Sequence, residues 1–583
     1  MKLLLKELWR RDHKSCLTIF TLQIASSLMG GIGIVMLIPM LELLDISVGS
    51  TGLLAQILAP LEGVGVAVRA LAILVIYIGL IVFKALLTRT LAVRQTKFIE
   101  GYTLELRDRL YEAVSHAGWE QLASRKQADT INLFTAQCNH VSTAVTSMLT
   151  LLSSLVTASI QIAIACWMSF PITLVICVVG LTLIGIFLPL RRKSRRYGRE
   201  MIRISRDFYG EIINQLNSVK EMRTYGVEED HAERYSTLGR SFFDAQVKYS
   251  YLKTLPNAVY SVSAAVLVSV VFLLSVIVLE IGTARLMVMV LIFSKLWPLF
   301  SSWQGMIMNI QTCVPALEKL NDTISDLRAS ASEQWSSEEI GFDRKVEFEN
   351  VAFRYAGGEG TVLENITFSL EHGRITALVG RSGAGKSTIA DLLMGFLHPE
   401  SGQICVDGVA LTSENIRAWR KYIGYIPQNP LIINASVREN LGRFHPDATE
   451  AEMIDALKSA VAWDFVQDLP EGLDTVLGDR GVRLSGGERQ RIVLARVLLG
   501  NPKVIILDEA TSALDYESEN AVRDVLRTMR SDAAILVIAH RLATVLIADE
   551  AIVLEQGRIT ESGTVSELIR NPGGYLAGMV SME

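Results

Sequence analysis

A chain of 583 residues is longer than one hydrophobic core usually serves, so at least two domains are expected. Half of the residues are apolar and the mean hydropathy is +0.33, an excess that lies almost entirely before residue 315. The net charge of −5 excludes a global basic field for nucleic acid. The six cysteines are scattered without a C-x-x-C pair, which argues against a disulfide framework or a cysteine metal site.

The first half contains six apolar stretches, each long enough to cross a bilayer, which takes about 20 residues. Lysine and arginine are concentrated in residues 1–15 and 191–196. Such clusters stay on the cytoplasmic side, so the N-terminus is predicted to lie in the cytoplasm. The predicted spans are 16–44, 65–93, 140–168, 171–192, 248–280 and 285–312.

Polar residues inside a span call for a functional hypothesis. Gln304 and Gln311 are seven residues apart in the sixth predicted span, with Met308 between them. Seven residues are close to two helical turns, so these side chains share a face and are candidates to line a transport cavity. Packing against neighbouring helices is the alternative.

The composition divides the chain into a helical membrane domain at 1–315, a polar linker at 316–343 and a second domain at 344–583. In the second domain, short β-branched runs alternate with helical patterns. Such runs suit buried parallel strands. The predicted fold is therefore a six-span helical domain followed by an α/β domain.

A glycine-rich loop, Gly380-Arg-Ser-Gly-Ala-Gly-Lys-Ser387, lies between a predicted strand and a predicted helix. This is the P-loop pattern, whose backbone N–H groups surround phosphate oxygens while the lysine neutralises the outer phosphates. The hydroxyl of Ser387 is a candidate Mg²⁺ ligand. The predicted ATP contacts are Gly380, Arg381, Ser382, Gly383, Ala384, Gly385, Lys386, Ser387 and Thr388.

Downstream, the apolar run 504–507 ends in two carboxylates, Asp508 and Glu509. An aspartate at a strand end can hold Mg²⁺, directly or through water, and the following glutamate can polarise a water toward the γ-phosphate. Strands often end in acidic residues, so the pattern gains its meaning from the P-loop in the same domain.

A second glycine-rich turn, Leu484-Ser-Gly-Gly-Glu-Arg-Gln490, opens another predicted helix about a hundred residues after the P-loop. One nucleotide site seldom needs two helix N-termini this far apart in one chain. We therefore expect each motif to face the complementary motif of another copy, which predicts an ATP-driven dimer.

These motifs, in this order and spacing, resemble the ATP-binding cassette (ABC) superfamily, and six spans fused before one cassette resemble an exporter-type half-transporter. The resemblance implies that Tyr355 stacks on adenine, that Gln428 and His540 act with Glu509 in catalysis, and that Mg²⁺ is held by Ser387, Gln428 and Asp508. The implied signature contacts to a partner chain's ATP are Leu484, Ser485, Gly486, Gly487, Glu488 and Gln490, and the implied D-loop is Ser512, Ala513, Leu514 and Asp515.

The resemblance further implies an ATPase coupled to transport in the inner membrane of a bacterium, with the ATPase domain in the cytoplasm. Coupling helices are expected near 118–126 and within 214–223. The expected cofactors are ATP and Mg²⁺, and the expected partner is a second copy, although a heterodimer stays open. Export of a peptide, lipid or amphipathic compound is the first choice. The alternatives are an importer with the exporter fold, for example of metal–siderophore complexes, and a soluble ATPase acting on nucleic acid.

Overall fold

The computed structural model describes two compact units. Unit 1 consists of Met1–Ser115 and Arg125–Arg328, and unit 2 of His116–Ser124 and Ala329–Glu583. The described residues are 2–36, 66–277, 283–330, 339–358, 360–509 and 516–582.

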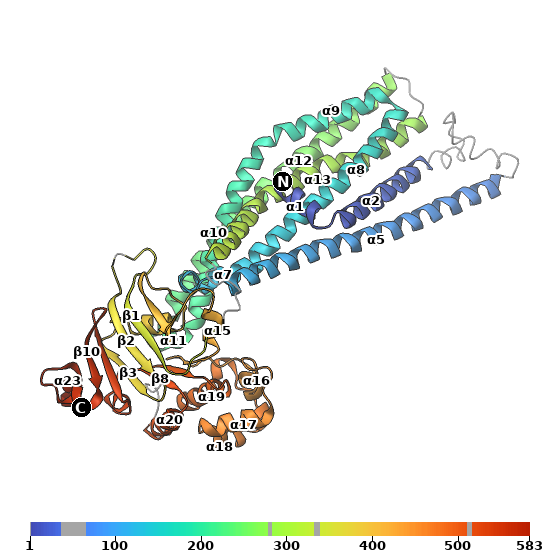
Figure 1. The fold of residues 1–583 in the computed structure, drawn as a ribbon. Helices are drawn as coiled ribbons and strands as arrows, with labels where there is room; N and C mark the ends of the chain where they lie inside the picture. Colours follow the sequence, from blue (N-terminus) through green and yellow to red (C-terminus); the bar gives the residue numbers. More distant parts are fainter. Residues whose placement is uncertain are drawn as a thin grey trace. The chain divides into compact units, whose positions relative to one another are not determined.

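Unit 1 is built from long helices (Figure 1). Its longest helices have 50 residues, or about 75 Å at 1.5 Å per residue. A hydrocarbon core of about 30 Å covers less than half of that length, so these helices extend well beyond the bilayer. The helices are α1 (Lys2–Arg11), α2 (His13–Val35), α5 (Val66–Ser115), α7 (Gln127–Asn132), α8 (Cys138–Met168), α9 (Phe170–Ile186), α10 (Leu188–Asn217), α11 (Val219–Tyr225), α12 (Glu228–Ile277) and α13 (Thr283–Ala329), with a π-helical turn at Leu133–Gln137.

Four segments of the described residues are long and apolar enough to cross a membrane: His13–Gly33, Ala70–Ser115, Gln127–Trp167 and Phe170–Leu190. The fifth and sixth predicted spans fall on α12 and α13, and the count of six stays a prediction. The fourth predicted span, 171–192, is interrupted at Phe187, where α9 ends and α10 begins with a proline in its first turn. Pro189 lacks an N–H, and in a continuous helix its ring would clash with the carbonyl of Gly185 four residues earlier, which explains the break.

The predicted linker starts too early, because α13 continues to Ala329. Ala316, Leu320, Ile324 and Leu327 are buried and recur at helical spacing. Burial of this apolar stripe stabilises the helix as far as Ala329, although the residues on its other face are polar.

Unit 2 contains a six-stranded sheet with the order β10-β9-β3-β8-β7-β6. Its five strands from β9 to β6 pair in parallel, and β10 pairs antiparallel with β9. This confirms the predicted α/β domain. The strands are β3 (Ile375–Gly380), β6 (Ile423–Ile426), β7 (Val504–Asp508), β8 (Ala534–Ala539), β9 (Glu550–Glu555) and β10 (Arg558–Thr564).

Two hydrophobic clusters cover the two faces of this sheet. Alternate residues of a strand point to opposite faces, and Ile375 and Ala377 belong to one cluster while Leu378 belongs to the other. Helix α14 (Lys386–Leu393) packs in the cluster of Leu378, and α19 (Gly486–Leu499) packs in the cluster of Ile375. The helices opened by the two glycine motifs therefore cover opposite faces of the sheet.

Unit 2 also has a four-stranded antiparallel sheet, β2-β1-β4-β5, which the sequence patterns did not reveal. Its strands are β1 (Lys345–Phe353), β2 (Leu363–Glu371), β4 (Ser401–Val406) and β5 (Val409–Ala410). The remaining helices are α6 (Trp119–Ala123), α15 (Ile416–Arg420), α16 (Val437–Gly442), α17 (Glu450–Ser459), α18 (Trp463–Gln467), α20 (Tyr516–Met529), α21 (Leu542–Val545), α22 (Val565–Arg570) and α23 (Tyr575–Met582), with 3₁₀ turns at Gly472–Asp474 and Asp479–Gly481.

Candidate nucleotide site

The predicted catalytic residues meet at one edge of the six-stranded sheet. Strand β3 ends at Gly380, β7 runs directly into Glu509, β8 runs directly into His540, and Gln428 lies two residues after β6. Because these strands are parallel, their carboxyl ends share the edge where open α/β sheets bind ligands.

The P-loop adopts backbone conformations that require its glycines. Gly380 has φ of 154°, and a Cβ built there lies 2.2 Å from the carbonyl oxygen of Leu554. Gly385 has φ of 106°, and a Cβ there lies 2.6 Å from a methyl carbon of Leu363. A side chain would collide with a backbone atom at Gly380 and with the buried side chain of Leu363 at Gly385, so the sequence gives this loop its shape.

Lys386 places its ammonium group at the centre of the loop. The side chain is 5 % exposed, and Nζ donates to the carbonyl oxygens of Gly380 at 2.8 Å and Arg381 at 3.0 Å. Burial lowers the pKa of Lys386, and the nearby carboxylates of Glu509 and Asp508 oppose that shift. A desolvated cation at a helix N-terminus is well placed to bind phosphate.

Glu509 is held from two sides. Its Oε2 accepts a hydrogen bond from Nε2 of Gln428 at 2.6 Å, and its Oε1 lies 2.7 Å from Nε2 of His540. Its backbone has φ of 49°, a left-handed conformation that costs a residue with a Cβ about 1–2 kcal/mol. The structure therefore brings all three predicted catalytic residues together.

Asp508 has neighbours that the sequence did not identify. The hydroxyl of Tyr425 donates to Asp508 at 3.4 Å. Burial and the charge of Glu509 raise the pKa of Asp508, and burial together with Asp508 raises the pKa of Asp391 on α14 to about 6. Asp391 lies on α14 after the P-loop but belongs to no recognisable sequence motif. It is close to Asp508 only in the folded protein, so no pattern in the sequence indicates this pairing.

Tyr355 lies next to a segment that comes from the first half of the chain. Its hydroxyl is 3.1 Å from the hydroxyl of Thr388, and its ring packs edge-on against Phe353 at 4.9 Å. The backbone N–H of the next residue, Ala356, donates to the carboxylate of Glu120 on α6 at 2.5 Å. The sequence predicted a coupling helix in this region but not this contact.

Helix α6 also packs against the rest of unit 2 through an aromatic contact. The rings of Trp119 and Phe396 lie 5.3 Å apart, and the guanidinium of Arg420 lies 4.7 Å from the centre of the Phe396 ring. The short segment 116–124 is therefore an integral part of unit 2.

The second glycine-rich motif forms a capped helix N-terminus. Ser485 accepts from the N–H of Glu488 at 3.2 Å, and the Glu488 carboxylate accepts from the N–H of Ser485 at 2.7 Å. This capping box fixes the start of α19 and leaves Ser485 exposed. Gln490 is only 4 % exposed. The predicted contact of Gln490 with a partner chain's nucleotide stays a prediction. The burial of the Gln490 side chain argues against this contact.

Two other groups of predicted residues have different outcomes. The D-loop Ser512, Ala513, Leu514 and Asp515 lies outside the described residues. Gln304 and Met308 are fully buried in unit 1 and Gln311 is half-buried, so their role in a cavity stays a prediction. Among the described residues, no cluster of three or more His, Cys, Asp or Glu forms a metal site.

Fold and site together define a P-loop ATPase fused to a helical membrane domain, and comparisons with known proteins agree. The family described as ABC transporter transmembrane region matches residues 20–300, and the family described as ABC transporter matches 363–512. The chain is 30% identical over 485 residues to the heterocyst differentiation ATP-binding protein HepA of Nostoc sp., covering 82% of this chain and 79% of that protein.

Two further matches extend this result. A putative multidrug export ATP-binding/permease protein of Staphylococcus aureus is 42% identical over 231 residues, which is 40% of each chain. A solved structure of a bacterial Atm1-family ABC exporter with ATP bound superposes with a TM-score of 0.80 at 23% identity, over 98% of both chains. This structural match shows that the chain has the same fold as that exporter.

The chain belongs to the ABC transporter family. It is an integral membrane protein of the exporter fold, and its ATP-binding domain is an ATPase coupled to transport. The alternative of a soluble ATPase is wrong, because the transmembrane family covers residues 20–300.

Proposed function

We propose that the protein is a homodimeric exporter of a peptide, lipid or amphipathic compound, driven by ATP hydrolysis through alternating access. The contact of Glu509 with both Gln428 and His540 carries the catalytic part of this proposal. Two related proteins add support for export, since one is named for multidrug export and the other is an exporter structure.

The placement of the two glycine motifs supports the proposed dimer. The P-loop opens α14 and the second motif opens α19, and these helices belong to different hydrophobic clusters on opposite faces of the sheet. In the proposed dimer, Ser485 and the backbone of Gly486 and Gly487 complete the phosphate site of the partner. Closure would then depend on ATP bound at both P-loops.

In the proposed catalytic step, Glu509 accepts a proton from the water that attacks the γ-phosphate. Gln428 and His540 orient its carboxylate, and Lys386 together with the loop N–H groups binds the phosphates. The Ser387 hydroxyl, the Gln428 amide oxygen and the Asp508 carboxylate are oxygen donors of the kind that Mg²⁺ prefers. Bound there, Mg²⁺ would neutralise charge on the β- and γ-phosphates.

Reconstitution into vesicles tests the direction of transport. ATP added outside energises only the molecules whose ATPase domain faces outward. An exporter of this orientation accumulates a stimulating compound inside the vesicle, whereas an importer depletes it. The compounds are chosen by a screen for ligand-stimulated ATP hydrolysis, and Glu509→Gln vesicles serve as the inactive control. ATP-dependent depletion would favour the importer.

Cross-linking tests the dimer. Ser382→Cys and Ser485→Cys are introduced together into a chain without its native cysteines. A flexible bismaleimide, which can span the nucleotide between the two thiols, is expected to link the chains when ATP is present, visible as a dimer on a denaturing gel. A chain that forms only internal cross-links, or none in the presence of ATP, would contradict the composite site.

A further inference from the structure

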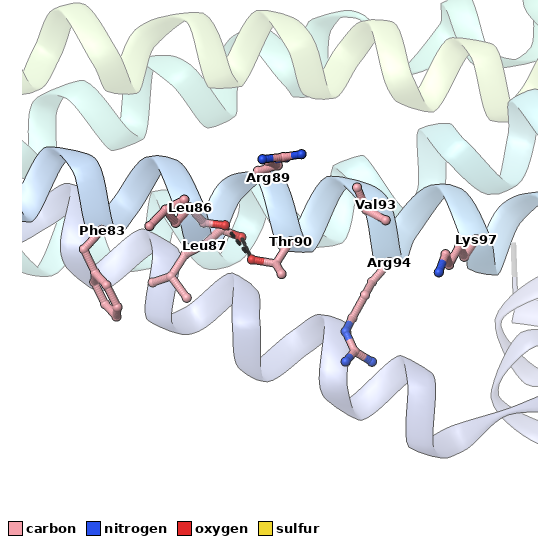
Figure 2. Close-up of a pocket in the computed structure, with 8 residues that line it drawn as sticks. All are labelled: Phe83, Leu86, Leu87, Arg89, Thr90, Val93, Arg94 and Lys97. Atoms are coloured by element: carbon pink, nitrogen blue, oxygen red, sulfur yellow. Dashed lines mark hydrogen bonds between the residues drawn. The ribbon is translucent and has the colours of Figure 1, made fainter.

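Helix α5 carries a cavity of about 580 Å³ on one of its faces. Figure 2 shows its lining residues, and the side chains of Phe83, Leu87, Thr90 and Arg94 leave the helix on the same side. The lining residues are Phe83, Leu86, Leu87, Arg89, Thr90, Val93, Arg94 and Lys97, which recur at intervals of three and four. This spacing places them on one face, with Arg89 at its edge.

A second cavity of about 480 Å³ adjoins the first, because Arg94 and Lys97 line both. Its other wall comes from the junction of α1 and α2, including Arg11 and Ser15. Two carboxylates line this cavity and both are engaged. Glu105 lies 2.5 Å from Nε of Arg11, and Asp12 accepts from the backbone N–H of Ser15 at 2.9 Å.

The basic side chains of the first cavity are not paired with a carboxylate among the described residues. Within the part of the chain that the structure describes, no carboxylate lies within ion-pairing distance of Arg89, Arg94 or Lys97, and all three are exposed. Arg94 and Lys97 are three residues apart on a helix, where like charges repel. A bound anion would relieve this repulsion.

Apart from Val93, the apolar residues of the same face precede the charged ones. Phe83 is 53 % exposed and Leu86 is 56 % exposed, and both precede Arg89 in the most apolar part of α5. From Phe83 to Lys97 is about 21 Å along a helix. The face therefore presents hydrocarbon toward the middle of the membrane and cations toward its surface.

We infer that this face of α5 is a binding site for an anionic phospholipid. The headgroup phosphate binds between Arg94 and Lys97, and an acyl chain lies along Phe83 and Leu86. A small inorganic anion would use the cations alone and leave the apolar part without a function. Basic pockets beside membrane helices bind anionic headgroups in this way.

Native mass spectrometry of the full-length protein tests the site. The protein is released from nanodiscs of phosphatidylcholine and phosphatidylglycerol, and the ratio of the two retained lipids is measured. We expect Arg94→Gln with Lys97→Gln to lower the preference for phosphatidylglycerol at least about tenfold, since each basic residue near an anionic surface contributes about fivefold. The matched control, Arg234→Gln with Arg240→Gln on α12, removes the same charge from exposed positions.

Further measurements separate the remaining explanations. An unchanged preference in the α5 variant, or an equal loss in the control, would overturn the site. Displacement of phosphatidylglycerol by inorganic phosphate would identify a simple anion site and also overturn it. A shift from dimer to monomer without loss of lipid would show that the face is a contact between protomers. Each single variant is measured beside the double one, with a melting curve, so that loss of folding is recognised.

Discussion

The amide of Gln428 donates a 2.6 Å hydrogen bond to the carboxylate of Glu509, a residue 81 positions later in the chain. The other oxygen of that carboxylate lies 2.7 Å from His540. The orientation of Glu509 therefore depends on loops that follow three different strands. A substitution at any of these strand ends is therefore expected to change the orientation of the proposed catalytic carboxylate.

Glu509→Gln is expected to lower ATP hydrolysis by at least about a hundredfold, because a general base contributes roughly 10²- to 10⁴-fold. The amide keeps the shape of the side chain, so the affinity for ATP should stay within about twofold. Hydrolysis by the purified protein in lipid and binding of a fluorescent ATP analogue measure the two effects. The exposed Glu471→Gln is the matched control, and hydrolysis at the wild-type rate in Glu509→Gln would refute the assignment.

Glu120→Ala is expected to raise the KM for ATP about three- to tenfold with little change in kcat. The substitution removes the acceptor for the Ala356 N–H and so loosens the loop that carries Tyr355. Hydrogen bonds to charged groups contribute about 1.5–3 kcal/mol, and an exposed one contributes less. Glu120→Gln keeps an acceptor oxygen and should restore most of the affinity. Equal KM values for the alanine and glutamine variants would exclude this role.

Gly380→Ala is expected to destabilise unit 2 by more than about 2 kcal/mol. The added carbon would lie 2.2 Å from the carbonyl oxygen of Leu554, a backbone atom that cannot move away without distorting β9. Melting curves monitored by fluorescence, with and without ATP, report the change in the transition that nucleotide shifts. Gly360→Ala, where no atom lies within 4 Å of the new carbon, should melt within one or two degrees of the wild type.

Asp391→Asn is expected to stabilise unit 2 at neutral pH. The pKa of Asp391 is raised to about 6 in the folded protein by burial and by Asp508, so the folded state binds a proton more tightly than the unfolded state. Stability from this group is present below about pH 4 and is lost as the pH rises through 6. The variant should therefore gain about 1 kcal/mol at pH 7.5, after allowance for partial exposure.

The same variant should gain much less at pH 4, where the folded wild-type carboxyl is protonated and the unfolded one is about half protonated. The melting temperature of the transition that ATP shifts is measured from pH 4 to pH 8 for both proteins. The exposed Asp468→Asn provides the control. A gain that does not vary with pH would show that the change acts through packing.

The elements that depend on near neighbours could be predicted from the residues alone. The glycines of the P-loop, the carboxylates after β7 and the capping residues of α19 are set by local backbone geometry, and their chemistry can be inferred from residue type and spacing. Apolar length determined the membrane helices in the same way, although it did not show the break at Phe187 or the extension of α13 to Ala329.

Which distant residues meet depends on how separate segments of the chain pack. The order of strands in a parallel sheet depends on the crossover connections, and that order brings Gln428, Glu509 and His540 to one edge. It also decided that Glu120, from a helix in the first half of the chain, contacts the loop after Tyr355, and that Gln490 faces inward. Periodicity assigns a residue to a face, but the partner on that face is fixed only when separate segments pack together.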